Sequence, residues 1–432
     1  MNIAIIHHHL HPGGVTRIIE SQVNALRNVV SDIQLTIVTG DTGQPLHATG
    51  NDIQIIEEEI FRYLAADISK VQALSAFQKI TKHLKIITGQ NDILHLHNLN
   101  LGKNPLLTLA VCRMAGHGMK IVNHCHDFAE DRPDNYSFLK SIIEGYFQEK
   151  LPEILYPPYD NYHYVVLTSG DYKRLAGYGI NPERISLLPN PVAFCLKENE
   201  RIPQDVVKEK LDIGRDLKIC LYPVRAIHRK NIGEFILLSV LFRNQASWLI
   251  TQPPQNPVEK PEYDRWKKFC SMHHIPVLFE AGKAIDIHEL MPAADLCIST
   301  SMMEGFGLAF MEPWLAGIPV IGRDIEHCTA DLKRNGIQFP LLYDRFIVSF
   351  NGEKTDFKDL DQKQQQQIIQ DVLHIPGKGK EIAEFNPFLN DFLNPVKQDI
   401  IRNNQQVIRE RYSLESYGQQ LHGIYKKLLG RA

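Results

Sequence analysis

The sequence predicts an α/β protein built from two doubly wound units, each with its own parallel sheet. Short apolar runs flanked by turn residues alternate with amphipathic stretches, and this alternation is typical of β-α-β units. The pattern begins at Asn2 and restarts at Lys218. At 432 residues the chain exceeds what one hydrophobic core usually supports, so two domains of roughly 200 residues each are expected.

The expected strands fall into two series. The first series comprises Asn2 to Ile6, Gln34 to Val38, Ile53 to Ile56, Ile93 to Leu96, Lys120 to Cys125 and Tyr164 to Thr168. The second comprises Lys218 to Val224, Trp248 to Thr251, Pro276 to Phe279, Asp295 to Ser299 and Ile318 to Ile321. Apolar residues at helical spacing also predict a helix through the glutamine-rich Gln362 to Gln367, and another over Leu414 to Leu429 with Ser413 as N-cap.

A polar, charged stretch separates the two series. It begins at Pro189-Asn190-Pro191-Val192, where proline fixes the backbone without offering strand donors, and it runs to about Asp216. We therefore predict a first domain over residues 1–195, a linker over 196–216, a second domain over 217–410 and a C-terminal helix within 411–432.

Composition excludes several classes of function. A net charge of -3 gives no positive electrostatic potential that would attract nucleic acid. The seven cysteines include no C-x-x-C pair, so neither a disulfide framework nor a zinc site is indicated, and a reducing cytoplasm is expected. The N-terminus opens on a strand pattern with no signal peptide, and no apolar run is long enough to cross a membrane. We expect no integral membrane association.

The strongest chemical signal is Glu304-Gly305-Phe306-Gly307-Leu308-Ala309-Phe310-Met311-Glu312. It follows an expected strand and is predicted to lead into a helix ending near Gly317, which would place both carboxylates within reach of one ligand. Carboxylates accept hydrogen bonds from sugar or ribose hydroxyls. The glycines would let backbone amides approach a phosphate or a developing negative charge.

A basic motif follows the first strand of the second series, at Val224-Arg225-Ala226-Ile227-His228-Arg229-Lys230-Asn231. Arginine offers a bidentate fork and lysine a point charge, a combination suited to a diphosphate leaving group. The sequence alone leaves open whether His228 or Arg229 shares this role.

Glycines and histidines mark the ends of strands in the first domain. Gly13 and Gly14 open a helix after the first strand, where they would allow a substrate close to the backbone. His124 and His126 follow the strand that starts at Lys120, at the edge where open α/β sheets bind ligands. We expect His95 and His97 to be packed or pocket-lining, and we expect no metal site at His7, His8, His9 and His11, because neighbours on a strand point in opposite directions.

These motifs, with Ala316-Gly317-Ile318-Pro319-Val320, resemble glycosyltransferase family four, which has an E-x7-E signature, an R-x4-K element and a glycine-rich first loop. The resemblance covers nearly the whole chain and implies the GT-B fold: two Rossmann-like domains facing a cleft, with the last helix crossing back to the first domain. Pro313-Trp314 departs from the family pattern, which affects local packing.

The resemblance also implies site residues. It places Glu304 and His126 against the transferred sugar and assigns them as catalytic. It puts Arg225, Lys230, Gly13 and Gly14 at the donor phosphates. The sugar and nucleotide would contact Gly305, Phe306, Gly307, Leu308 and Glu312.

The function implied is that of a retaining, metal-independent hexosyltransferase using a UDP, GDP or ADP sugar as substrate, with no cofactor. The alternatives are a nucleotide-sugar epimerase on the same scaffold and a noncatalytic nucleotide-sugar-binding subunit, since fold does not fix function. A phosphorylase would need a pyridoxal-phosphate lysine, to which no motif points.

The acceptor is expected to be a soluble small molecule or saccharide. Residues 1–195 hold 16 Lys and Arg against 19 Asp and Glu, which would not attract an anionic leaflet. An amphipathic helix is expected over Tyr136 to Lys150, as a wall of the acceptor pocket.

Overall fold

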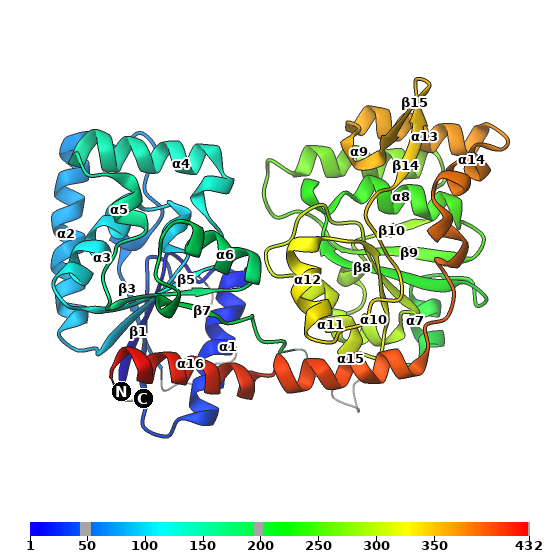
Figure 1. Ribbon diagram of the computed structural model, residues 1–432. Helices are drawn as coiled ribbons and strands as arrows, with labels where there is room; N and C mark the ends of the chain where they lie inside the picture. The colour runs from blue at the N-terminus through cyan, green and yellow to red at the C-terminus, as the bar shows by residue number, and fades with distance from the viewer. Residues whose placement is uncertain (44–52, 194–201, 431–432) are drawn as a thin grey trace. The chain divides into compact units, whose positions relative to one another are not determined.

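The computed structural model describes residues 1–43, 53–193 and 202–430 (Figure 1). The described residues divide into two compact units. Unit 1 combines Met1–Ala193 with Glu410–Ala432, and unit 2 is Phe194–Arg409. Of the predicted linker, residues 196–201 lie outside the described residues, and the rest contains a short helix, α7 (Gln204–Lys210).

Unit 1 is built on a seven-stranded parallel sheet in the order β3-β2-β1-β4-β5-β6-β7. Its strands are β1 (Asn2–His7), β2 (Gln34–Thr39), β3 (Gln54–Glu57), β4 (Ile93–His97), β5 (Lys120–Cys125), β6 (Tyr162–Val166) and β7 (Ile185–Leu187). The order reverses between β1 and β4. In open α/β sheets, ligands bind outside the carboxyl ends of the strands at such a reversal.

Helices cover both faces of this sheet (Figure 1). They are α1 (Gly14–Val29), α2 (Lys70–Thr88), α3 (Pro105–Gly116), α4 (Pro133–Lys140), α5 (Leu151–Leu155), α6 (Ser169–Gly177) and α16 (Leu414–Leu428). Strand alternation sends Ile3 and Ile5 of β1 toward α1 and α16, whereas Ala4 and Ile6 point to the opposite face. The C-terminal helix α16 therefore belongs to the packing of unit 1.

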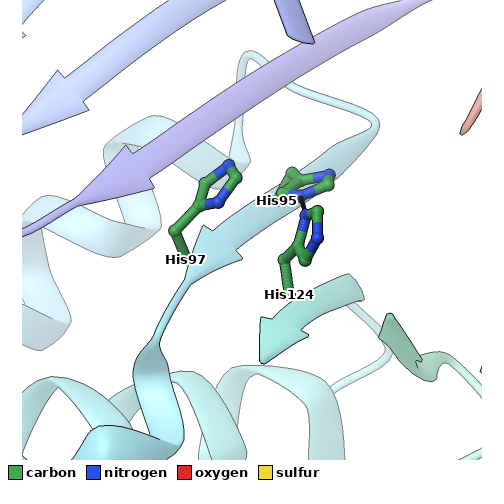
Figure 2. A group of neighbouring side chains, drawn as sticks. All are labelled: His95, His97 and His124. Atoms are coloured by element: carbon green, nitrogen blue, oxygen red, sulfur yellow. Dashed lines mark hydrogen bonds between the residues drawn. The ribbon is translucent and has the colours of Figure 1, made fainter. Parts of the chain in front are cut away.

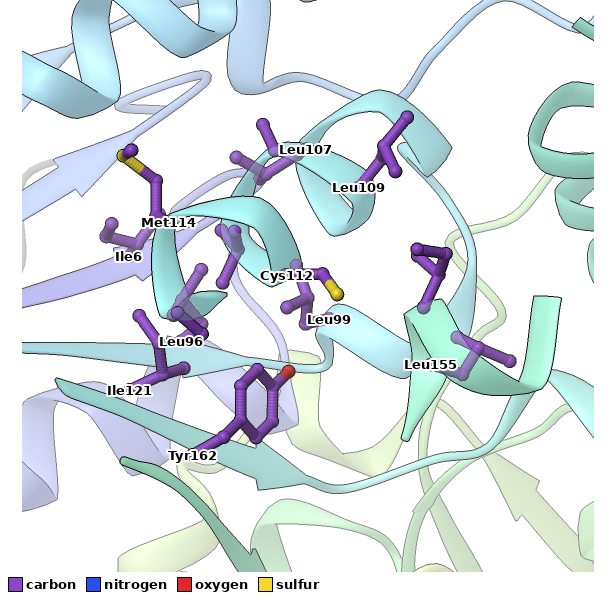
Figure 3. Packing of buried hydrophobic residues seen from close by; sticks show 14 of the residues in the cluster. Ile6, Leu96, Leu99, Leu107, Leu109, Cys112, Met114, Ile121, Leu155 and Tyr162 are labelled. Carbon is purple, nitrogen blue, oxygen red and sulfur yellow. The ribbon is translucent and has the colours of Figure 1, made fainter. Parts of the chain in front are cut away.

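The second of these faces holds the larger core of unit 1. Figure 3 shows α3 laying Leu107, Cys112 and Met114 over Leu96 of β4 and Ile121 of β5. All five side chains are at most 8% exposed. Burial of this kind contributes roughly 25 cal/mol per Å² of apolar surface, so it fixes where the strand ends lie.

Unit 2 repeats the architecture with a six-stranded parallel sheet in the order β10-β9-β8-β11-β12-β13. Its strands are β8 (Lys218–Arg225), β9 (Ala246–Gln252), β10 (Val277–Phe279), β11 (Leu296–Ser299), β12 (Val320–Arg323) and β13 (Leu342–Tyr343), with an antiparallel pair β14 (Ile347–Phe350) and β15 (Glu353–Asp356) beside it. The remaining helices are α8 (Ile232–Leu241), α9 (Lys260–Met272), α10 (Ile287–Ala293), α11 (Glu312–Leu315), α12 (Glu326–Arg334), α13 (Gln362–His374), α14 (Lys378–Phe385) and α15 (Gln398–Arg411). Two doubly wound parallel sheets confirm the predicted fold class.

The helix predicted over Tyr136 to Lys150 is present, but it begins earlier, at Pro133, and ends earlier, at Phe147. The α-helical part ends at Lys140, a π-helical turn follows over Ser141–Tyr146, and the chain leaves it at Phe147. Leu139, Ile142 and Ile143 are nevertheless buried against the core, as the apolar stripe required. The π-helical segment thus continues α4 beyond Lys140.

Two of the predicted helices begin at side-chain caps. Ser413 accepts a hydrogen bond from the Ser416 amide at the start of α16. Asp361 and Gln364 form a reciprocal capping box at the start of the glutamine-rich α13.

Six cysteines are free and buried, and the seventh, Cys195, lies outside the described residues. Within residues 1–43, 53–193 and 202–430, none of the helices has both the length and the apolar character that crossing a bilayer requires.

Candidate active site

The sequence motifs of unit 2 meet where its strand order reverses, at the carboxyl ends of β8 and β11. A short 3-10 turn, His228–Lys230, follows β8, and the loop that carries Glu304 follows β11. Parallel pairing of Cys297 with Leu221 brings the two strand ends to one edge of the sheet. This is the position at which doubly wound sheets bind ligands.

Lys230 and Glu304 form an ion pair at this edge, with both side chains 9% exposed. A guanidinium nitrogen of Arg229 lies 3.2 Å from the same carboxylate and also donates to the Met303 carbonyl at 2.8 Å. Burial by itself would raise the pKa of Glu304, but Lys230 and Arg229 reverse this effect and leave that pKa below its ordinary value. Burial lowers the pKa of Lys230, and Glu304 partly offsets that shift.

Hydroxyl groups hold the two loops together beneath this pair. The Tyr222 hydroxyl donates to the Lys230 carbonyl at 2.9 Å and lies 2.7 Å from the Ser301 hydroxyl. The Thr300 hydroxyl donates to the same Lys230 carbonyl at 3.0 Å. The backbone of Lys230 is therefore held by hydroxyl groups, and its ammonium group is held by the Glu304 carboxylate.

A buried charged network holds the residue that follows Lys230. The Arg323 guanidinium pairs with the carboxylates of Glu234 and Asp356, and all three side chains are at most 3% exposed. Glu234 also accepts from the Asn231 amide at 3.0 Å and from the Tyr343 hydroxyl at 2.7 Å. Asn231 has a left-handed φ of 47°, and this hydrogen bond anchors it in that conformation directly after Lys230.

The segment between Glu304 and Glu312 differs from the predicted two-turn helix. Gly307 has φ 90°, a 3-10 turn covers Leu308–Phe310, and α11 begins only at Glu312 with Pro313 in its first turn. A left-handed residue and a proline without an amide hydrogen each interrupt helical hydrogen bonding. Glu304 therefore lies in the loop after β11, whereas Glu312 begins the short helix α11.

The glycines of this segment have different structural requirements. At Gly307 a Cβ would lie 3.1 Å from Cys328 Cβ, and the positive φ disfavours any other residue. At Gly305 the φ is not positive and a Cβ would meet nothing within 4 Å. The fold thus requires glycine at 307 but not at 305. The ring of Phe306 is buried between them, and Leu308 is partly buried.

The basic residues of this region do not all gather at Glu304. Arg225 ends β8, and its Nε donates to the Gln252 side-chain oxygen at 3.4 Å. His228 is held elsewhere, because its ring lies 3.1 Å from Glu262. Of the two residues, Arg229 is therefore the one that lies at Glu304, and which of them contacts a phosphate stays a prediction.

A possible metal-binding pattern elsewhere in unit 2 has a structural use. The Asp-x-Asp run Asp359-Leu360-Asp361 stands at the start of α13, where the Asp361 side chain caps the helix by accepting from the Gln364 amide at 2.9 Å. It does not follow β8 or β11.

In unit 1, Gly13 and Gly14 stand at the start of α1, directly after the loop that follows β1. A Cβ at Gly14 would meet nothing within 4 Å, and a Cβ at Gly13 would lie 3.7 Å from its nearest neighbour. Neither residue has a positive φ in the left-handed region. Among the described residues, the N-cap Gly13 makes no side-chain hydrogen bond to the first turn of this helix, and a helix N-terminus is a setting that favours an anion.

His126 follows β5 and is held by Asn98, whose side-chain oxygen accepts from the backbone amides of His126 and Asp127 at 2.8 and 3.0 Å. Its ring nitrogen Nε2 lies 2.9 Å from Nδ1 of His97. Burial lowers the pKa of His126 to about 4, so the imidazole is neutral at pH 7. A neutral imidazole beside a sugar can accept one hydrogen bond and donate another.

Sequence reasoning missed several residues that build these sites. Tyr222 and Asn98 fix the loops, and Gln22 of α1 reaches the histidines behind His126. Gln22 could have been noticed, because it stands among Ile18, Ile19 and other apolar residues on the buried stripe of its helix. A polar residue on such a stripe needs a buried partner.

Comparison with known proteins shows which proteins this chain resembles. Residues 204–360 match the family model "Glycosyl transferases group 1". Mannosylglucosyl-3-phosphoglycerate synthase of Petrotoga mobilis is 28% identical over 392 residues, covering 85% of this chain and 72% of that protein. Mannosylglucosylglycerate synthase of Thermotoga maritima is 25% identical over 319 residues, covering 68% of this chain and 71% of that protein.

Solved structures agree on the fold. Sucrose-phosphate synthase from Thermosynechococcus elongatus superposes with a TM-score of 0.62 at 15% identity, covering 100% of both chains. HepE from Anabaena, in complex with UDP and glucose, gives a TM-score of 0.61 at 14% identity, covering 99% of this chain and 100% of that one. The protein is a glycosyltransferase with the GT-B fold, and residues 204–360, within its second unit, match the glycosyl transferases group 1 model.

Proposed function

We propose that this glycosyltransferase moves a hexose from a nucleotide-diphosphate sugar to a hydroxyl of a small soluble acceptor, with retention of anomeric configuration and without a metal ion. The observation that carries the proposal is the Lys230–Glu304 pair, fixed at the β8–β11 strand ends with Arg229 beside it. It puts two cations and one carboxylate where a doubly wound sheet binds a ligand.

The chemistry assigned to these groups follows from their charges. Transfer of the sugar leaves negative charge on the diphosphate, which Lys230 and Arg225 would stabilise in place of a metal. Glu304 would accept hydrogen bonds from the transferred sugar, and Glu312 from the ribose. His126 would contact the donor sugar through its neutral imidazole. Gly14 and Gly305 fit this assignment, because a Cβ at either would meet nothing within 4 Å, and a Cβ at Gly13 would make only an ordinary contact, 3.7 Å from the His11 carbonyl oxygen.

The acceptor proposal rests on two observations. The synthases of Petrotoga mobilis and Thermotoga maritima are named for sugars joined to glycerate or 3-phosphoglycerate, which are small and soluble. Residues 1–195 also carry more acidic than basic side chains. We therefore propose a sugar-linked glycerate, with or without phosphate, as the acceptor class.

Mass-spectrometric screening tests the function directly. UDP, GDP and ADP sugars would each be incubated with glucosylglycerate, its 3-phosphate and simple saccharides, and a donor-only reaction would run beside them. The proposal expects a product whose mass gain is one hexose, and NMR of the product to show the anomeric configuration of the donor. A new sugar nucleotide in the donor-only reaction would instead identify an epimerase, and binding without turnover would identify a noncatalytic subunit.

Liposome flotation tests the soluble acceptor. The helix α2 carries Lys79, Lys82 and Lys85 together with exposed Val71 and Ile86, and it is the surface that would contact an anionic membrane. We expect no co-flotation of the wild-type protein. Salt-sensitive co-flotation that Lys82→Glu abolishes would contradict a soluble acceptor.

A further inference from the structure

Four histidines line up on one face of the unit 1 sheet because of strand register. His95 and His97 are two residues apart on β4, so both point to the face covered by α1 and α16. His97 pairs in register with His124 of β5, which points the same way, and His126 follows two residues later. Figure 2 shows His95, His97 and His124 projecting together from the two strands, with a hydrogen bond between His95 and His124.

One half of a continuous hydrogen-bond chain joins His126 to α1. The side-chain oxygen of Gln22 lies 2.8 Å from His97 Nε2, and an amide oxygen only accepts, so His97 carries its hydrogen on Nε2. A neutral imidazole has one such hydrogen, which leaves His97 Nδ1 bare. His97 Nδ1 then accepts from Nε2 of His126 at 2.9 Å.

The other half of the chain joins α1 to the C-terminal helix. The Gln22 amide nitrogen donates to the Tyr425 hydroxyl at 3.0 Å. The Tyr425 hydroxyl donates to His95 Nδ1 at 2.7 Å, and the Gln22 amide nitrogen also lies 3.3 Å from that atom. His95 Nε2 in turn donates to His124 Nδ1 at 3.2 Å. Every donor along the chain thus points in the same direction, and Gln22, 0% exposed, sets that direction through the orientation of its amide.

We propose that Gln22 and His97, held in place by Tyr425, are positioning residues that fix His126 as the neutral tautomer with its hydrogen on Nε2. The remaining nitrogen, Nδ1, has no hydrogen-bond partner among the residues that the structure describes, and it is presented as an acceptor for a hydroxyl of the donor sugar. The catalytic consequence rests on the proposed role of His126, whereas the tautomer does not. A wrong tautomer would present a hydrogen where the substrate needs an acceptor.

Burial keeps the four histidines neutral. Desolvation lowers the pKa of His95 to about 3 and that of His126 to about 4, and it also lowers the pKa values of His97 and His124, so none of the four carries a charge at pH 7. Nitrogen atoms of His95, His97 and His124 lie within 4.8 Å of one another, a spacing that could suggest a metal site. The hydrogen bonds already engage both nitrogens of His95 and of His97. Among the ring nitrogens of His95, His97 and His124, only His124 Nε2 lacks a partner within the described residues.

The test begins with nitrogen-15 NMR of histidine-labelled full-length protein, with the His126 signals assigned by their loss in His126→Gln. The hydrogen is expected on Nε2. In Gln22→Glu, a carboxylate beside His97 favours a doubly protonated His97, whose Nδ1–H must donate to His126 and move the His126 hydrogen to Nδ1. A wild-type hydrogen on Nδ1, or a tautomer that Gln22→Glu does not move, would overturn the proposal.

A matched pair at His97 covers the possibility that Gln22→Glu fails to fold. His97→Asn offers an oxygen acceptor near the former Nδ1 and should keep the His126 hydrogen on Nε2, whereas His97→Leu removes the acceptor. We expect kcat/KM to fall about tenfold or more in His97→Leu and to recover in His97→Asn. The nucleotide dissociation constant should be unchanged in both. Equal losses in the two variants, or stoichiometric binding of added zinc that displaces these hydrogen bonds, would contradict the assignment.

The NMR and kinetic readouts test separately the catalytic role of His126 and the positioning role of Gln22 and His97. If the tautomers behave as assigned but His126→Gln keeps full activity, the proposed role of His126 fails while the hydrogen-bond chain stands. If His126→Gln is inactive but the tautomer of His126 is the same in His97→Leu as in the wild type, the positioning role of His97 fails.

Discussion

The ammonium group of Lys230 and the carboxylate of Glu304 form an ion pair at one edge of the unit 2 sheet, although 74 positions separate them in the sequence. Each side chain is 9% exposed, so each depends on the other for charge compensation. A donor diphosphate arriving at this edge would meet a lysine that is already fixed and charged.

We predict that replacing Glu304 and replacing Glu312 change different kinetic constants. Glu304→Ala should chiefly lower kcat, because this carboxylate lies at the proposed position of the reacting sugar. Glu312→Ala should chiefly raise KM for the donor. Each loss is expected to be about 1.5 to 3 kcal/mol, or roughly ten- to a hundredfold. Steady-state kinetics measures both, and Glu304→Gln serves as the variant that keeps the shape and removes the charge. Near-native kinetics in both alanine variants would rule out these roles.

We predict that Gly14→Ala and Gly305→Ala preserve stability and lose activity. Neither new methyl group meets protein atoms within 4 Å, so the substitutions should leave folding stability unchanged and should interfere with the bound ligand. Gly322→Ala is the contrasting variant, because its Cβ would lie 2.1 Å from the Ser299 carbonyl oxygen at a φ of 138°. Thermal melting should show native midpoints for the first two variants and a large loss for the third. Full activity of Gly305→Ala would mean that no ligand approaches there.

Much of the fold could be predicted because parallel strands buried on both faces read as apolar runs. The residues of β1, β5 and β8 were identified almost to their ends. Three-residue β7 (Ile185–Leu187) is too short to show a period, and the β14–β15 hairpin was overlooked although Asn351-Gly352 is a strong turn signal.

The site was predictable in its residues but not in their relationships. Glu304 and Lys230 stand in recognisable motifs, whereas their pairing arises from the register of β8 against β11. The helix expected between Glu304 and Glu312 was wrong, since the left-handed Gly307 and Pro313 override the apolar pattern. The histidine chain could not be foreseen, because it joins α1 to α16 over 403 positions.

Stability is predicted to fall in mild acid. Burial lowers the folded-state pKa of His95 to about 3 and those of His8 and His163 to about 4, so between these values and about 6.5 the unfolded chain binds protons that the folded chain does not. The free energy of unfolding therefore decreases as pH drops through that window, by up to about 1.4 kcal/mol per pH unit for each such histidine.

Urea denaturation between about pH 7.5 and about pH 5 measures this slope. His163→Gln should reduce the slope by about one proton, because this ring is buried in unit 1 and is hydrogen-bonded to Ser186. His117→Gln, at the exposed end of α3, provides the surface control. Stability that is flat or that rises toward acid would contradict the buried neutral histidines.

Activity is predicted to survive EDTA. Protein cations at the donor site would supply the charge that a metal supplies in other transferases, so chelation should leave kcat/KM unchanged. Arg225→Ala and Lys230→Ala should each lower it strongly. Loss of activity in EDTA with recovery on adding magnesium or manganese would show that a metal takes part.

The measurement closest to the central claim is calorimetric titration of the full-length protein with UDP, GDP and ADP, repeated on Lys230→Ala and on Lys283→Ala. Lys283 also pairs with a carboxylate, that of Glu280, but stands in the turn after β10 rather than at the β8–β11 edge. We predict that one nucleotide binds the wild-type protein and Lys283→Ala alike, and binds Lys230→Ala about tenfold or more weakly, since a charged hydrogen bond contributes about 1.5 to 3 kcal/mol. Equal affinity for wild-type and Lys230→Ala protein would place the donor elsewhere and contradict the account.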